Sequence, residues 1–154
     1  MQLEYEIISL IILIGLSGFF SGLEVALVGT TRSKVRQMLN EKLPGSTSLD
    51  KLKSNPSRMM ASVNLGNNLV NVASTALATD IALKTFESAG LAIVIGVMTF
   101  LILVFGEITP KTYCNANAAK IALRYSRVLL AFSYAFYPIV WMFEKITKGI
   151  INLT

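Results

Sequence analysis

The stretch Phe105-Gly106-Glu107-Ile108-Thr109-Pro110-Lys111 decides how the rest of this sequence is interpreted. It closes residues 89–106, which contain no charged side chain and are long enough to cross a lipid bilayer as a helix. Glu107 follows directly. A carboxylate at membrane depth is unfavourable unless it is paired or solvated, so Glu107 is a candidate functional residue.

Pro110 adds a backbone argument to the same stretch. Proline lacks the N–H that would bond the carbonyl oxygen four residues earlier, and its ring presses against that carbonyl. The carbonyl belongs to Gly106, so we predict a kink or a local widening of the helix into a π-type turn. A freed backbone oxygen beside a carboxylate supplies two ligands of the kind that a hard cation prefers.

The composition is that of an integral membrane protein. Of 154 residues, 53% are hydrophobic and only 15% are charged. The absence of histidine excludes imidazole metal sites and histidine-based catalysis, and the single Cys114 excludes an intrachain disulfide and a multi-thiolate zinc site. Basic and aromatic residues do not alternate, so we expect no nucleic-acid partner.

We predict an all-α membrane protein with three spans, at about residues 5–29, 59–83 and 89–112. The connection between the first two is strongly basic. Its basic residues, set against only Glu41 and Asp50, are Arg32, Lys34, Arg36, Lys42, Lys51, Lys53 and Arg58. The positive-inside rule places this connection in the cytoplasm, which puts the N-terminus outside and the C-terminus inside.

Short helices are expected in the basic connection. Thr31 or Ser33 can cap one that runs to about Lys42, and another is predicted from Asp50 until Pro56. Residues 80–88 are predicted to form a short extracellular connection.

Residues 128–143 are apolar but only 16 long, and they contain Pro138 and aromatic residues typical of a membrane interface. We predict a juxtamembrane helix over about 128–148 on the cytoplasmic side, in contact with lipid; the alternative is a fourth span.

The first two spans are unusually polar. The second holds Ser62, Asn64, Asn67, Asn68 and Asn71. Because several of these asparagines share a helix face, they indicate a polar cavity, and the alternative is hydrogen bonding between helices. The first span holds Ser17 and Ser21, each of which can pack or act as a ligand.

Two further features of the first span have alternative interpretations. Glu24 is interpreted as part of a structural ion pair or as a hydrogen-bond anchor, with direct ion handling as the alternative. Gly15, Gly18 and Gly22 offer a close-packing surface, from which we predict a helix-bundle homodimer.

Taken together, the three spans offer an all-oxygen ligand set. The candidate ligands are Ser21, Gly66, Asn67, Asn71, Gly106 and Glu107, with Ser17, Ser62, Asn64 and Asn68 as weaker candidates. Such a set fits Na⁺, Mg²⁺ or Ca²⁺, and composition does not choose among them.

Three motifs resemble those of the CNNM/CorC (cyclin M) family of magnesium transporters. They occur in the family's order and are Phe20-Ser21-Gly22-Leu23-Glu24-Val25-Ala26-Leu27, Leu65-Gly66-Asn67-Asn68-Leu69-Val70-Asn71-Val72 and Gly106-Glu107-Ile108-Thr109-Pro110-Lys111.

The resemblance covers nearly the whole chain and implies a single dimeric transmembrane domain, residues 1–154, in the plasma membrane. It implies export of Mg²⁺ with Na⁺ as the coupled ion. The bound Mg²⁺ would be dehydrated and held by Ser21, the 66–71 region, Glu107 and a nearby backbone oxygen. In the family a cytoplasmic pair of CBS modules follows, so the sequence is expected to continue beyond Thr154.

Three function classes can be weighed on these residues. An intramembrane enzyme would need an activated nucleophile or paired acids, and the only intramembrane acids are Glu24 and Glu107, so we predict no enzyme activity. A membrane anchor or regulatory domain that binds a cation without transporting it remains the alternative. A cation carrier accounts for both the asparagine face and Glu107.

Overall fold

The computed structural model describes residues 2–85 and 88–151, and this part of the chain is helical. In chain order the elements are α1 Gln2–Gly29, α2 Arg32–Asn40, α3 Ser46–Ser54, α4 Pro56–Thr85, α5 Ser88–Leu103, the π-helical turn η1 Val104–Ile108, α6 Thr109–Ala116, α7 Ala118–Ala135 and α8 Tyr137–Ile151. The predicted all-α class is therefore confirmed.

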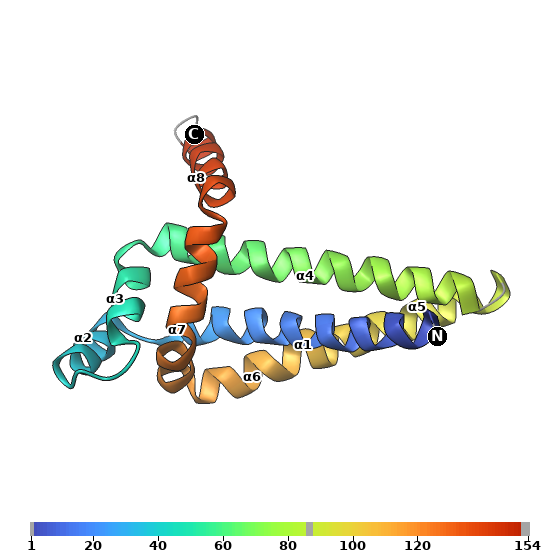
Figure 1. Ribbon diagram of the computed structural model, residues 1–154, viewed down its shortest axis with the longest axis horizontal. Helices are drawn as coiled ribbons and strands as arrows, with labels where there is room; N and C mark the ends of the chain where they lie inside the picture. The colour runs from blue at the N-terminus through green and yellow to red at the C-terminus, as the bar shows by residue number, and fades with distance from the viewer. Residues whose placement is uncertain (1, 86–87, 152–154) are drawn as a thin grey trace.

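Three long helical stretches lie side by side and form the body of the molecule (Figure 1). α1 and α4 pack against each other in opposite directions, and the continuous stretch α5–η1–α6 returns alongside α1. An ion pair of 2.7 Å between Lys84 Nζ and Glu6 Oε1 joins the end of α4 to the beginning of α1. These packed stretches bring the three sequence motifs onto neighbouring helices.

Among the described residues, two helices are long and apolar enough to cross a membrane, Leu3–Gly29 and Ala92–Ala116. A third span would result if the bent pair Ala118–Ala135 and Tyr137–Phe143 crossed together. α4 has ample length, at 30 residues, but its serine, asparagine and threonine side chains lower its hydropathy. The described chain thus has two to three candidate spans and is a multi-pass helical membrane protein.

The basic connection folds into two short helices at one end of the bundle (Figure 1). Thr31 caps α2 as predicted, because its Oγ1 accepts a hydrogen bond of 3.3 Å from the Lys34 backbone N–H. α3 begins at Ser46 and not at Asp50, directly after Gly45 turns the chain with a φ of 95°. Pro56 opens α4, since a proline is well tolerated in the first turn of a helix.

The connection expected over residues 80–88 is shorter than predicted. α4 continues through Asp80 to Thr85, and Lys84 Nζ lies 2.6 Å from Asp80 Oδ2 one turn earlier. Such a pair supports a helix instead of ending it. Residues 86 and 87, the remainder of this connection, lie outside the described residues.

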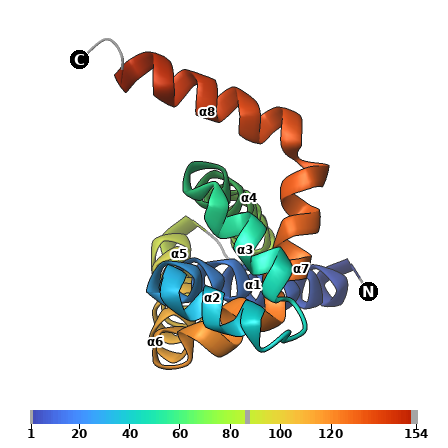
Figure 2. The ribbon, with the colours of Figure 1, turned by 90° about the vertical axis from the view of Figure 1, so that its left-hand side faces the viewer.

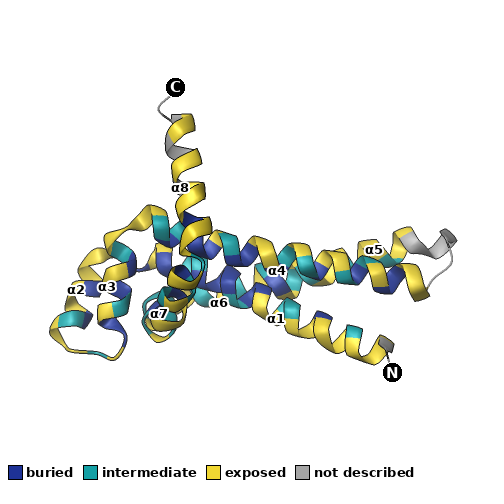
Figure 3. Ribbon diagram, turned by 45° about the horizontal axis from the view of Figure 1, so that its top comes forward, coloured by how far each residue is buried: buried dark blue, intermediate teal, exposed yellow. Residues whose placement is uncertain are grey.

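The buried core lies where α1, α3, α4 and α7 meet. Leu23, Leu27, Leu49, Val63 and Leu129 are almost completely buried there. Figure 3 shows these buried faces turned toward one another, whereas most of α8 is exposed. Because these apolar side chains pack α1 against α4, the polar residues on the adjoining turns of both helices are held in fixed positions.

The predicted single helix over about 128–148 is instead two helices. α7 ends at Ala135 and α8 begins at Tyr137, with a bend of 80° between them. Pro138 in the first turn of α8 has no N–H to continue α7, and the Phe136 N–H closes α7 by bonding the Phe132 carbonyl at 2.9 Å. Figure 2 shows α8 leading away from the bundle after this bend.

Candidate cation site

Ser17, near the middle of α1, joins all three helical stretches. Its buried hydroxyl donates to Asn71 Oδ1 on α4 and lies 3.1 Å from the carbonyl oxygen of Gly106 in η1. Three oxygen atoms therefore gather around a single hydroxyl hydrogen. An oxygen-rich cluster of this kind is electronegative and can serve as a set of ligands for a hard cation.

One helical turn away, two more oxygens are buried without a partner. Within the described part of the chain, neither Ser21 Oγ nor Asn67 Oδ1 makes a hydrogen bond, although both atoms are shielded from solvent. Because α1 and α4 are antiparallel, the contact between Ser17 and Asn71 places Ser21 opposite Asn67. Buried polar atoms are nearly always satisfied in native proteins, so this pair is suited to a ligand supplied from outside the chain.

Gly66 sets the distance between these two helices. A Cβ atom at this position would meet the Phe20 ring at 2.3 Å, closer than real Cβ contacts allow. The Phe20 ring is held in turn by Phe19 and Phe132, whose centroids lie 5.3 and 5.2 Å away. Gly66 therefore has a packing role that its sequence motif did not disclose, and its predicted role as a backbone ligand stays a prediction.

The π-type turn predicted at Pro110 is confirmed by η1. The Thr109 N–H bonds the Val104 carbonyl, a five-residue step typical of a π-helix. The Gly106 carbonyl accepts from Ser17 on α1, so it is turned toward the neighbouring helix. Pro110 itself packs against Gly18, where an added Cβ would lie 2.9 Å from the proline Cγ.

Glu107 is half-buried, and its carboxylate is engaged by a lysine. Lys111 Nζ donates to Glu107 Oε1 at 2.9 Å, and it lies 3.8 Å from Glu24 Oε2 on α1. The interpretation of Glu24 as a structural ion pair is thus supported. Lys111 was not predicted as a partner, although its spacing of four residues from Glu107 is the signal that could have shown it. A cation bound by Glu107 has to compete with this ammonium group.

The weaker candidates separate into different environments. Ser62 is buried, and its hydroxyl donates to the Arg58 carbonyl at 2.8 Å within its own helix. Asn64 and Asn68 are exposed on the outer face of α4, whereas Asn67 and Asn71 point toward α1 and the interior. The structure therefore brings Ser17, Asn71 and Gly106 into direct contact and leaves Ser62, Asn64 and Asn68 outside this cluster.

The glycines of α1 do not form the free surface that was expected for dimerisation. Gly18 faces Pro110, and Gly22 faces Cys114, where an added Cβ would lie 2.5 Å from Sγ. Only Gly15 of the three has no neighbour within 4 Å of such an atom. The small residues thus let α6 approach α1 within one chain, which is the same close packing used between separate membrane helices.

Acidic and thiol side chains do not cluster around this centre. Across residues 2–85 and 88–151, no group of three or more histidine, cysteine, aspartate or glutamate side chains could hold a metal ion. A cation at this place would be held by hydroxyl, amide and backbone oxygens with Glu107 alongside.

Fold and site together define a helical membrane domain whose polar residues meet inside the bundle. Residues 8–154 match the family model described as the cyclin M transmembrane N-terminal domain, and the chain belongs to this CNNM family. The resemblance seen in the three motifs is thereby confirmed.

Curated relatives are similar over most of this chain. A UPF0053 protein of Haemophilus influenzae and the UPF0053 inner membrane protein YfjD of Escherichia coli are both 35% identical to it, over 95% and 90% of the chain. A chloroplastic DUF21 domain-containing protein of Arabidopsis thaliana is also 35% identical, over 94% of the chain. The matched regions make up only 35%, 32% and 22% of these relatives' lengths, so this chain spans about a third of them or less.

Proposed function

We propose that this domain binds Mg²⁺ as its transported ion and exports it, with Na⁺ entry as the coupled movement. Membership of the CNNM family supports a role in the membrane, and the oxygen-lined centre supports a hard cation as the cargo. Mg²⁺ would be held in dehydrated form by Ser21, Asn67, Asn71, Glu107 and backbone oxygens at Gly66 and Gly106.

One observation carries the proposal: two oxygens from facing helices are buried without a partner. Leaving a polar group buried and unsatisfied costs about 1–3 kcal/mol. Ser21 Oγ and Asn67 Oδ1 both bear this cost, one turn from the cluster of Ser17, Asn71 and Gly106. A dehydrated cation bound here would give both oxygen atoms a partner. The two oxygens would in turn replace water molecules that the ion loses from its hydration shell.

Ion flux tests the proposal. The chain is reconstituted into liposomes loaded with Mg²⁺, and the release of Mg²⁺ is followed with a fluorescent indicator under inward and outward Na⁺ gradients. We expect release that depends on the Na⁺ gradient and that is lost in Glu107→Gln. Saturable Mg²⁺ binding without any flux would favour the alternative, a membrane anchor or regulatory domain that binds a cation and does not transport it.

Replacing Ser21 with alanine should show whether Ser21 is an ion ligand or a structural residue. Because its hydroxyl is unpartnered, Ser21→Ala should leave the thermal stability of the ion-free chain equal or slightly higher. Its Mg²⁺ affinity should nevertheless fall by about tenfold, since one ligand is lost. Thermal unfolding with and without Mg²⁺ measures both quantities.

Ser74→Ala is the matched control, because this buried hydroxyl already donates to its own helix at the Val70 carbonyl. Equal Mg²⁺ affinity in the parent and Ser21→Ala would remove Ser21 from the site.

The finer topology belongs to the same proposal. α1, α4 and α5–η1–α6 would form three spans in the plasma membrane, with an extracellular N-terminus, a cytoplasmic basic end, and α8 as a juxtamembrane helix in contact with lipid. Cytoplasmic CBS modules are the partners that we propose. They would follow α8, which leads away from the bundle.

We also propose a homodimer. Asn64, Asn68 and Thr75 lie on one exposed face of α4, and a single chain leaves these polar groups of a membrane helix uncovered. A second copy facing this surface, around a polar cavity, would remove them from lipid. Light scattering in detergent should give the mass of two chains. Active monomers would contradict this arrangement.

A further inference from the structure

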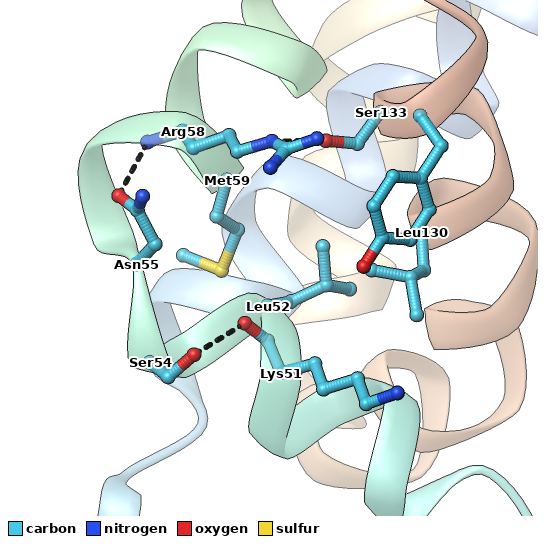
Figure 4. Close-up of a pocket in the computed structure, with 9 residues that line it drawn as sticks. Lys51, Leu52, Ser54, Asn55, Arg58, Met59, Leu130 and Ser133 are labelled. Carbon is cyan, nitrogen blue, oxygen red and sulfur yellow. Dashed lines mark hydrogen bonds between the residues drawn. The ribbon is translucent and has the colours of Figure 1, made fainter. Parts of the chain in front are cut away.

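A pocket of about 330 Å³ opens at the basic end, remote from the candidate cation site. It lies between α3, the first turn of α4, and α7, as Figure 4 shows. Its polar lining comes from Lys51, Ser54, Asn55, Arg58, Ser133 and Tyr134, with Leu52, Met59 and Leu130 as its apolar part. The lining therefore contains two cations and no acidic side chain.

The Arg58 side chain lines this pocket, and one nitrogen of its guanidinium makes no hydrogen bond within the described residues. Its Nε donates to Ser133 Oγ at 3.2 Å, so the guanidinium reaches from α4 to α7 (Figure 4). The rings of Tyr134 and Tyr137 lie 5.1 and 4.4 Å from its central carbon, which fixes the plane of the group. Nη2, however, is buried and has no acceptor among the described residues. A guanidinium held in one orientation, with an N–H group that has no acceptor, is suited to donate a hydrogen bond to an anionic oxygen.

The surroundings of Arg58 also favour an anion. Asn55 Oδ1 accepts from the Arg58 backbone N–H at 3.1 Å, which places the N-terminus of the 30-residue helix α4 at the pocket. That end of a helix carries a partial positive charge. On α3, burial lowers the pKa of Lys53, and the nearby Arg32 guanidinium lowers it further.

The position of the pocket relative to the membrane indicates which kind of anion it binds. The segment without charged side chains begins at Met59, so Arg58 stands at the boundary between the membrane interior and the basic end. Tyr134 and Tyr137 are aromatic residues of the type that lie at the headgroup level of a bilayer. Phosphate groups are the anions found at this depth, and their oxygens match the planar fork of arginine.

We infer that this pocket binds a phosphate group through Arg58, with Lys51 as a second cation. The phosphate can be part of an anionic lipid headgroup or a free phosphate, and the experiment below separates the two sources. A phosphate bound in the pocket would link α7 to the start of α4 and would thereby stabilise the bend between α7 and α8. The inference does not depend on cation transport.

The test measures binding to the delipidated chain in detergent by native mass spectrometry and by thermal stabilisation. Three probes are compared: phosphatidylglycerol, diacylglycerol with the same acyl chains, and inorganic phosphate. The variants are Arg58→Gln and Lys51→Gln, with Arg36→Gln as the matched control. Arg36 is exposed on α2, carries the same charge and does not line the pocket.

We expect phosphatidylglycerol to bind the parent chain and diacylglycerol to bind far more weakly. Arg58→Gln should weaken the binding by about tenfold or more, the scale of a charge-assisted hydrogen-bond pair. Lys51→Gln should weaken it by a smaller factor, and Arg36→Gln should leave it unchanged. Inorganic phosphate that binds as tightly as the lipid identifies a free phosphate as the occupant, and much weaker binding identifies a lipid.

Two results would overturn the inference. One is equal binding of diacylglycerol and phosphatidylglycerol, and the other is an equal loss in Arg36→Gln and in the pocket variants. If Arg58→Gln does not fold, Lys51→Gln carries the test, because Lys51 is exposed. Unchanged binding in a folded Lys51→Gln would then count against the site.

Discussion

Replacing Glu107 with glutamine should abolish Mg²⁺ binding and leave the helical fold intact. Glu107 is the only carboxylate among the proposed ligands, and glutamine keeps its size and one oxygen while it removes the charge. Neutral oxygens alone cannot offset the cost of dehydrating a divalent cation, because that cost greatly exceeds the gain from a few dipoles. Mg²⁺-dependent thermal stabilisation should therefore disappear in this variant.

Glu24→Gln is the matched control for this experiment. Glu24 lies on α1 and also faces Lys111, but at 3.8 Å, compared with 2.9 Å for Glu107. Both variants remove one carboxylate from the same lysine, so a general effect of the liberated ammonium group would appear in both. We expect Glu24→Gln to keep most of the Mg²⁺ affinity. Mg²⁺ stabilisation that survives in Glu107→Gln would exclude this residue from the site.

Pro110→Ala should weaken Mg²⁺ binding by roughly tenfold to a hundredfold, without abolishing it. Alanine restores an N–H that can bond the Gly106 carbonyl and close η1 into a regular α-helix. The Gly106 oxygen would then turn back into its own helix, away from Ser17 and the proposed ion. Titration of Mg²⁺ into the parent and the variant in the same detergent measures the difference.

A second variant separates this backbone effect from packing. The Pro110 ring lies against Gly18, so alanine also leaves a small space at that contact. Pro110→Val has a similar side-chain volume and regains the N–H, and it should therefore lose affinity as alanine does. If valine binds Mg²⁺ as tightly as proline, packing is responsible and the freed-carbonyl explanation is wrong.

Local chemistry made several features predictable from the sequence. A break in the regular helix follows from Pro110, because its missing N–H leaves the Gly106 carbonyl without a helical partner. The structure shows that this break takes the form of a π-helical turn, one of the two forms predicted. The cap of α2 by Thr31 is equally local. The long first and third helices follow from residues without charge that can satisfy their backbone only internally in a membrane.

The sequence nominated polar residues for the candidate site, and it could not show which of them lie together. Ser21, Asn67 and Asn71 were nominated because polar groups are unfavourable in lipid, and Gly106 because Pro110 frees its carbonyl oxygen. The sequence ranked Ser17 among the weaker candidates, although its hydroxyl joins three helices. Which serine meets which asparagine depends on the register of α1 against α4, and the close contact between Phe20 and Gly66 is part of that packing.

By itself, then, the sequence determined the helical class, the membrane character, the break in the helix before Pro110 and the oxygen chemistry of the candidate ligands, because each depends on residues within one or two turns of the chain. Only the tertiary structure decided that Gly18 and Gly22 receive α6 within one chain, that Lys111 holds Glu107 near Glu24, and that α8 leaves α7 at 80°. These features depend on contacts between side chains distant in sequence, or on how a break at proline is directed in space. Periodicity and composition cannot specify them, because many registers and bend directions fit the same apolar pattern.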